Sequence, residues 1–470
     1  MSETSIKKNI IKNTMILSIG NFLTKAVSFF LLPLYTSVLS KADYGISDLI
    51  QNISYLLIPF IGLQIGSGLF RFIINKNDKE ERKEIVSFCF FILLIISIVF
   101  LIIMFVINKL LSIPYSGLFS LYFISMLFSE FVSRLLRGLR KDTLYAACSF
   151  LNTLIYIILN LFFILNLKMG GESIIISLSL GSIISGIIFL SLIKVWELID
   201  LRSINKEKGK EILSYSIPLI PNAISWGIVN VSDRVIISKF LNVAENGIYA
   251  VANKFPVIFT TFFSALDMAW VEALSEINDI EERKNYISEN FQSVFVLLAD
   301  ICILLICVIS IIFKFFVGKE FIEAYNHTYI LVVAIFFNSI SSLYGGIFVA
   351  YKDSKTISKT TVYGAITNII INISLIKIIG LYAASISTLV SYFVIFFVRN
   401  IKLKKYVEIK WNVPKLISLV ILLTIVSIGY FISNDILNII ILLIMFIWTI
   451  YSNRKTLDTI LLTIKRGISR

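Results

Sequence analysis

The chain has 470 residues, of which 57% are hydrophobic and only 16% are charged, and its mean hydropathy is +0.88. A soluble domain carries roughly 25% charged residues, so this composition excludes an ordinary water-soluble protein. The net charge of +13 comes from short Lys and Arg clusters between apolar blocks, without a nucleic-acid-binding motif, which excludes a nucleic-acid partner.

Apolar blocks recur along the chain at about the 20-residue length of a helix that crosses a hydrocarbon core. The alternating pattern of membrane β-strands does not occur in them. We therefore predict an all-α integral membrane protein with about fourteen transmembrane helices. In chain order the predicted segments are 14–39, 44–70, 85–108, 115–137, 143–166, 173–194, 213–241, 246–270, 290–316, 327–350, 357–378, 380–399, 414–432 and 435–452.

The distribution of positive charge predicts the orientation. With the N-terminus in the cytoplasm, the cytoplasmic segments hold 33 of the 43 Lys and Arg residues and the outer loops hold seven. Cytoplasmic loops are enriched in these residues, so we expect both termini to face the cytoplasm. Residues 1–13 are polar and basic, and no small-residue cleavage site follows, which predicts a retained first helix. The chain is thus expected to be a multi-pass protein of the cytoplasmic membrane.

Two stretches of sequence indicate an internal repeat in the same direction. The first match sets Gly45 against Gly247, and the second sets Arg140 against Lys352; the accompanying pairs are Asp43 with Glu245, Leu39 with Leu241 and Asn160 with Asn372. Parallel repeats of this kind occur in many transporters. We predict an N-terminal lobe over 1–200, a C-terminal lobe over 201–411, and an extra helix pair with a cytoplasmic tail over 412–470.

Prolines support this division, because five of the seven lie in the first two predicted helices of each lobe. Proline removes a helix hydrogen bond, and such breaks within a membrane tend to lie beside a cavity. We therefore expect helix bends, and a mobile set that lines a cavity, at Pro33, Pro59, Pro218, Pro221 and Pro256.

Several motifs in both halves resemble the Wzx-type polysaccharide flippases of the MOP superfamily, whose relatives are the lipid II flippases and MATE exporters. The resemblance covers about residues 5–400. Its motifs are Lys12-Asn13, Pro33-Leu-Tyr-Thr, Asp43-Tyr-Gly, Leu69-Phe-Arg-Phe72, Tyr215-Ser-Ile-Pro-Leu-Ile-Pro221, Ser232-Asp-Arg234 and Gly247-Ile-Tyr-Ala-Val-Ala-Asn-Lys254.

This resemblance implies two six-helix lobes around a central cavity that opens alternately to each side. It implies a cargo of oligosaccharide on a polyprenyl diphosphate lipid, carried to the outer leaflet for cell-surface polysaccharide export. Membrane lipids, a polysaccharide polymerase and glycosyltransferases are the implied partners. In lipid II flippases an extra helix pair forms a groove for the lipid tail, and whether the pair after residue 412 does so is open.

Three cations inside predicted helices, Lys25, Arg234 and Lys254, are candidates for binding the diphosphate. A charge within the bilayer costs about 2.5–3.5 kcal/mol on insertion scales and is usually functional. Arg offers a bidentate fork to phosphate and Lys a point charge. The alternatives are a structural pair with a carboxylate for Arg234 and snorkelling to the outer interface for Lys254.

Other polar residues within the helices suggest further roles. Asp300 lies in the middle of a predicted helix and is a candidate for pairing with a cavity cation or binding a coupling ion. Glu130 and Asp48 lie near predicted helix ends, where solvation at the membrane interface accounts for them. Sugar contacts are predicted for four amides, whose alternative role is hydrogen bonding between helices: Gln51, Asn52, Asn222 and Asn230.

The sequence argues against covalent chemistry. It lacks a Gly-rich phosphate-binding loop, and its four cysteines and single His327 have no metal-ligand spacing, so we expect no ATPase activity, metal or cofactor. The main alternative to a flippase is a drug or cation antiporter of the same fold. An integral-membrane polysaccharide polymerase is a weaker alternative, because the loops are short and poor in histidine.

Overall fold

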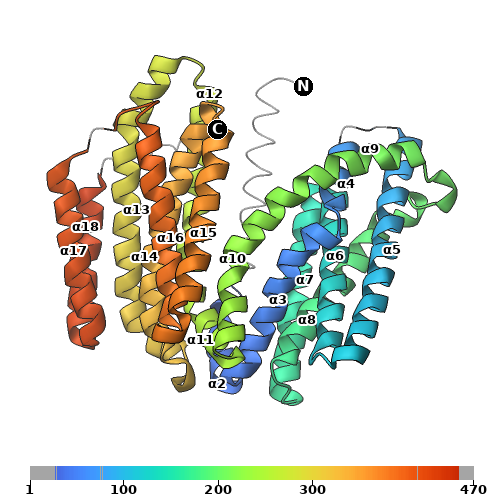
Figure 1. Cartoon of the computed structure of the whole chain (residues 1–470), viewed down its shortest axis with the longest axis horizontal. Helices are drawn as coiled ribbons and strands as arrows, with labels where there is room; N and C mark the ends of the chain where they lie inside the picture. Colours follow the sequence, from blue (N-terminus) through green and yellow to red (C-terminus); the bar gives the residue numbers. More distant parts are fainter. Residues whose placement is uncertain (1–26, 28, 75, 77, 410, 455–470) are drawn as a thin grey trace. The chain divides into compact units, whose positions relative to one another are not determined.

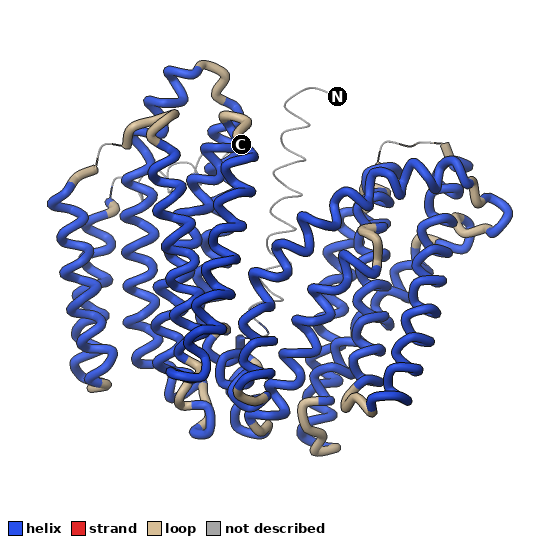
Figure 2. The backbone as a smooth tube through the Cα atoms, viewed as in Figure 1, coloured by secondary structure: helices blue, strands red, loops and turns tan. Residues whose placement is uncertain are grey.

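The computed structural model describes residues 27, 29–74, 76, 78–409 and 411–454, and every regular element in this part of the chain is helical (Figure 2). Eleven of its helices are long and apolar enough to cross a membrane. The bent pair α3 (Lys41–Ile61) and α4 (Ile65–Ile73) makes a twelfth span if it is taken as one. The prediction of an all-helical, multi-pass membrane protein is confirmed.

These twelve spans coincide with twelve of the fourteen predicted segments. The first predicted segment, 14–39, lies mostly outside the described residues. The segment 213–241 contains α10 (Ile220–Phe240), which is not among the candidate spans and whose sequence includes Asp233 and Arg234. The count of fourteen therefore stays a prediction.

Packing divides the chain into two compact units. Among the described residues, unit 1 contains Val38–Gly247 with the few residues before Leu32, and unit 2 contains Leu32–Ser37 with the residues from Ile248 on. The predicted lobe boundary at 200/201 follows the sequence repeat and stays a prediction. Besides α3, α4 and α10, unit 1 contains α5 (Lys79–Leu111), α6 (Ser116–Gly138), α7 (Asp142–Leu161), η1 (Phe162–Asn166), α8 (Glu172–Leu192), η2 (Val195–Glu197), η3 (Leu201–Ser203), α9 (Lys206–Ser216) and η4 (Ile217–Leu219).

The core of unit 1 is built around the short helix α4. Ile65, Leu69 and Ile73 recur every four residues, lie on one face and are fully buried. They belong to one cluster with Leu135 of α6 and Ile212 of α9. Burial of apolar side chains thus holds α4 between helices that are distant in sequence.

Unit 2 is a second helical bundle, and α11 (Val243–Ala252) crosses the boundary between the units. Within it, α17 and α18 pack against α13 (Figure 1). Its helices are α2 (Leu32–Val38), α12 (Lys254–Glu276), α13 (Ile280–Phe316), η5 (Lys319–Phe321), α14 (Ala324–Ala350), α15 (Ser354–Ile379), α16 (Tyr382–Leu403), α17 (Val413–Ile432) and α18 (Asp435–Ser452).

A buried arginine ties three helices of unit 2 together. Arg399 of α16 is only 5% exposed. Its guanidinium donates to the Thr360 hydroxyl at 2.9 Å, to the Thr361 hydroxyl at 3.2 Å and to the Ser341 carbonyl at 2.6 Å. Hydrogen bonding to several oxygens offsets part of the cost of burying the charge.

Arg140 and Lys352, which the predicted repeat sets against each other, have similar local backbone structures. Arg140 after α6 and Lys352 after α14 both have φ of 57°. Both lie at a helix end whose following N–H groups bond back to carbonyls of the last turn. In unit 1, Gly45 and Gly247 lie against each other, and a Cβ on either would overlap a backbone carbonyl beside the other, that of Val243 or Lys41.

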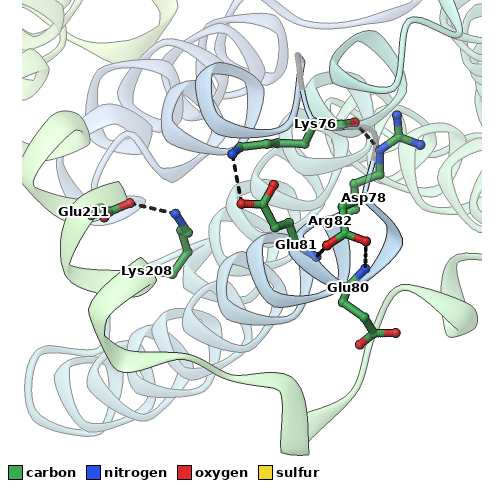
Figure 3. Close-up of polar contacts among 7 residues, drawn as sticks. All are labelled: Lys76, Asp78, Glu80, Glu81, Arg82, Lys208 and Glu211. Atoms are coloured by element: carbon green, nitrogen blue, oxygen red, sulfur yellow. Dashed lines mark hydrogen bonds and ion pairs between the residues drawn. The ribbon is translucent and has the colours of Figure 1, made fainter.

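Solvated ion pairs organise the connection from α4 to α5 (Figure 3). The Lys76 ammonium lies 2.9 Å from the Glu81 carboxylate, and Arg82 Nε donates to the Lys76 carbonyl at 2.6 Å. Lys208 and Glu211 pair at 2.9 Å on the neighbouring α9. Exposed pairs of this kind contribute about 0–1 kcal/mol each, so we interpret them as a charged surface of unit 1 rather than as a site.

Candidate functional site

The helix break after Pro59 creates an irregular turn inside unit 1. Pro59 lies in the last turn of α3, and Leu63 and Gln64 adopt left-handed conformations with φ of 51° and 52°. The axes of α3 and α4 differ by 59° across this break. The bend directly follows Pro59, and the turn at the bend brings Gln64 to the lining of a cavity.

A partly open cavity of about 750 Å³ lies within unit 1, lined by five helices and the α3–α4 turn. Its volume falls in the range of small-molecule and cofactor sites. It is lined by Tyr55, Ile58, Pro59, Gln64, Tyr122, Met126, Ser129, Glu130, Ser133, Arg134, Arg137, Tyr145, Asn152, Leu178, Ser182, Ala223 and Gly227.

One face of α6 supplies most of the polar lining. Its cavity residues are spaced three, four and seven apart, which places them on one side of an α-helix, and they run from Tyr122 to Arg137. The opposite face packs into the core through residues such as Phe131 and Leu135. The helix therefore presents two cations and one carboxylate to the cavity.

Arg137 is held by two aromatic rings. Its guanidinium carbon lies 5.3 Å from the ring centre of Phe70 on α4 and 5.7 Å from that of Tyr145 on α7. Cation–π contacts of this kind fix a guanidinium without using its N–H groups. Within the described part of the chain, Arg137 makes no hydrogen bond or ion pair, so these donors are available to a ligand in the cavity.

Arg134 lies one turn earlier on the same face of α6 and forms an ion pair with Glu130. Its Nε is 3.7 Å from the Glu130 carboxylate, and the two side chains are 35% and 30% exposed. The cavity thus contains one arginine held by aromatic rings and one with a carboxylate neighbour.

The rest of the polar lining is neutral. Tyr55 of α3 and Tyr122 of α6 contribute aromatic rings with hydroxyl groups. Asn152 of α7 donates to the Ser182 hydroxyl of α8 at 3.4 Å. Aromatic faces, hydroxyls and amides together can pack on sugar rings and hydrogen-bond their hydroxyls.

The three predicted cargo cations lie elsewhere. Lys25 is outside the described residues. Arg234 of α10 pairs with Asp48 of α3, with Nε 2.9 Å from the carboxylate, and both side chains are largely buried. The carboxylate-paired alternative for Arg234 thus has a partner, Asp48. Lys254 is the first residue of α12 and is half-buried. Their roles in cargo binding stay predictions.

Two of the predicted sugar-binding amides bond to their own helix. Gln51 and Asn52 donate to the carbonyls of Ser47 and Asp48, one turn earlier in α3, at 3.1 and 2.8 Å. Asn222 is exposed in the first turn of α10, and the side chain of Asn230 is outside the described part. Gln51, Asn52 and Asn222 do not line the cavity of unit 1, and sugar binding by all four amides remains a prediction.

Asp300 has a hydrogen-bond partner within unit 2. It is fully buried in α13, and its carboxylate accepts a hydrogen bond of 2.6 Å from Asn453 at the end of α18. This bond joins the C-terminal helix pair to α13. Coupling-ion binding by Asp300 also remains a prediction.

Most of the predicted bend prolines lie in the first turn of a helix or just before it; for Pro256 this helix start is a break within the candidate span Val243–Glu276. Pro33, Pro221 and Pro256 lie in the first turns of α2, α10 and α12, and Pro218 lies in the short η4 before α10. The first turn tolerates proline because its N–H groups have no intrahelical acceptor. Pro59 alone of the five lies near the end of a helix, directly before the sharp bend.

In the amino-acid sequence, the feature that indicates this cavity is a stripe of polar residues along one face of α6. Tyr122, Ser129, Ser133 and Arg137 recur at helical spacing within an otherwise apolar segment. Glu130 belongs to the same stripe, although its place near a helix end suggests solvation at the membrane interface. The stripe lines the cavity of unit 1, and only packing shows this.

Known proteins resemble this chain in both sequence and fold. The membrane protein MJ1375 of Methanocaldococcus jannaschii is 22% identical over 423 residues, which cover 85% of this chain and 100% of that protein. The inward closed structure of the lipid II flippase MurJ matches with a TM-score of 0.71 and 15% identity, over 94% of this chain and 100% of that one. An inward-facing multidrug resistance MATE family transporter of the MOP superfamily matches with a TM-score of 0.64 and 13% identity, over 81% and 95% of the two chains.

A sequence family described as polysaccharide biosynthesis protein matches residues 10–278, more than half of the chain. This match agrees with the resemblance of the motifs, and the two solved structures share the fold. The chain belongs to the polysaccharide biosynthesis protein family and has the fold of the MOP superfamily.

Proposed function

We propose that the protein is a flippase that carries a polyprenyl-diphosphate-linked oligosaccharide from the cytoplasmic to the outer leaflet of the cytoplasmic membrane. It does so by alternating access and without covalent chemistry. Family membership supports a role in polysaccharide biosynthesis, and the shared fold supports a transporter of the MOP type.

The observation that carries the proposal is the mixed lining of the cavity in unit 1. Arg137, with unused N–H donors, and Arg134, one turn away, suit a diphosphate, which Arg recognises through paired hydrogen bonds. Tyr55, Tyr122 and Asn152 suit sugar rings and hydroxyls. A cargo that combines phosphate and sugar needs both kinds of group.

Arg134 and Arg137 lie in the last two turns of α6, which the positive-charge bias orients toward the cytoplasm. In this orientation the diphosphate binds near the cytoplasmic end of the cavity, where the loaded lipid is made. The glycosyltransferases that build the oligosaccharide are the proposed suppliers of the cargo, and a polymerase on the outer side is its proposed consumer.

This orientation predicts a labelling pattern in whole cells. In a background without the four native cysteines, Cys at Ser40 or Asn434 is expected to react with an impermeant thiol reagent, because both positions precede helices at the outer side. Cys at Lys404, on the cytoplasmic side, is expected to react only after the cells are permeabilised. Labelling of Lys404→Cys in intact cells would indicate the opposite orientation, with Arg134 and Arg137 at the outer end of the cavity.

Depletion of the protein tests the function. We expect complete lipid-linked repeat units to accumulate and surface polysaccharide to fall, because assembly continues while translocation stops. Extraction of polyprenyl-linked sugars followed by mass spectrometry measures this. Normal lipid-linked pools together with increased sensitivity to cationic drugs would instead support a drug antiporter, the alternative that the cavity carboxylate Glu130 favours.

A further inference from the structure

Glu130 is an unexpected residue in a cavity for an anionic cargo. Its carboxylate lines the cavity beside Arg134, where it would repel a phosphate. The 3.7 Å between the carboxylate and Arg134 Nε is longer than the about 2.7–2.9 Å of a tight charge-assisted hydrogen bond. Glu130 and Arg134 therefore form a loose ion pair that a competing anion can open.

The backbone of α4 limits where the pair can move. A Cβ added at Gly66 would lie 2.9 Å from the Glu130 carboxylate and 3.1 Å from Arg134 Cγ, so both side chains lie directly against this helix. They cannot retreat farther toward α4. Their remaining freedom is toward the cavity that both of them line.

Arg137 provides an internal comparison. It lies three residues after Arg134 on the same face of α6, but aromatic rings rather than a carboxylate hold it in place. Arg134 and Arg137 are separated by about 4.5 Å along the helix axis, so a phosphate that binds Arg137 first brings its remaining oxygens close to Arg134. The phosphate and Glu130 then compete for the same guanidinium.

We propose that Glu130 is a resident counter-ion of the cargo site, which occupies Arg134 in the empty cavity and yields it to a phosphate of the cargo. This inference rests on the proposed function for the identity of the anion. By restoring the internal pair as the cargo leaves, Glu130 lowers cargo affinity and promotes release. A transporter that binds its cargo too tightly turns over slowly. Glu130 therefore lowers the affinity for the cargo and raises the rate of transport.

The test measures binding to the full-length protein in lipid nanodiscs. The probes are inorganic pyrophosphate and geranylgeranyl diphosphate, and the variants are Glu130→Gln, Glu130→Asp and Arg137→Gln. Glu130→Gln is expected to bind pyrophosphate about two- to fivefold more tightly, because a partly exposed competing ion pair is lost. Glu130→Asp keeps the charge but shortens the side chain by one methylene, so its affinity should lie between those of wild type and Glu130→Gln. A merely structural role of Glu130 would not increase affinity.

The outcomes separate the two proposals. If Arg137→Gln loses binding while Glu130→Gln binds no more tightly than wild type, the phosphate site stands and the counter-ion role is wrong. If wild type and Arg137→Gln bind both probes equally, or neither binds, the phosphate site and the inference both fall. Tighter binding of geranylgeranyl diphosphate alone by Glu130→Gln supports the inference with a lipid headgroup as the anion, whereas tighter binding of both probes supports it for phosphate in general.

Discussion

Replacing Arg137 with Gln is expected to abolish translocation of the lipid-linked oligosaccharide while the protein remains in the membrane. The variant loses the donors that we assign to the diphosphate. A hydrogen bond to a charged group contributes about 1.5–3 kcal/mol, so cargo binding should weaken roughly 10- to 100-fold. Arg137→Lys keeps the charge but loses the planar fork and much of the ring stacking, so it should retain partial activity. Complementation of a deletion strain, scored by surface polysaccharide, measures both effects.

Arg140→Gln is the matched control for this experiment. Arg140 lies three residues farther along the same helix end, is exposed, and does not line the cavity. It carries the same charge, so a general effect of basic residues on insertion would appear in both variants. Equal activity of Arg137→Gln and Arg140→Gln, at equal membrane levels, would remove Arg137 from cargo binding.

Replacing Gly45 with Ala is expected to destabilise unit 1 and to reduce transport strongly. The new Cβ would overlap the carbonyl oxygen of Val243, and a backbone atom cannot move aside as a flexible side chain can. The helices must separate, and overpacking of this kind costs about 1–3 kcal/mol. Gly247→Ala should behave alike, because its Cβ would overlap the Lys41 carbonyl. The melting temperature of the purified protein in detergent measures the loss.

Gly117→Ala is the control, since Gly117 lies in a membrane helix of the same unit and a Cβ there meets nothing within 4 Å. It should keep or slightly raise the melting temperature, because alanine favours a helix over glycine by about 1 kcal/mol. A Gly45→Ala variant as stable and active as Gly117→Ala would show that the close approach of these backbones is not required.

The contact between Gly45 and Gly247 also shows how the repeat in the sequence relates to packing. The repeat aligns the two glycines as equivalent positions, and in unit 1 they are neighbours. Sequence comparison identifies the pair as equivalent, but equivalence alone does not predict contact.

The partners of buried charged residues are harder to predict from the amino-acid sequence than the repeat is. The sequence identifies Arg234 as a charge within a helix, but its partner Asp48 is 186 residues away. From its position near a helix end, Asp48 is expected to be solvated at the membrane interface, and the sequence does not identify it as the partner of Arg234. Asp300 likewise finds Asn453, 153 residues along the chain. Such pairs depend on how helices pack, and the apolar periodicity of each helix leaves many packings possible.

A multi-pass helical membrane protein is predictable from the amino-acid sequence, because the bilayer rather than neighbouring segments sets the length and apolar character of a spanning helix. The family is predictable as well, through motifs that stay local along the chain. Which polar residues face a cavity depends instead on tertiary structure. The stripe from Tyr122 to Arg137 has the same spacing whether it faces lipid headgroups, another helix or a cargo site. Only the packing of α3, the α3–α4 turn, α7, α8 and α10 around that face makes it the lining of a cavity, because side-chain burial depends on neighbouring helices and not on one segment alone.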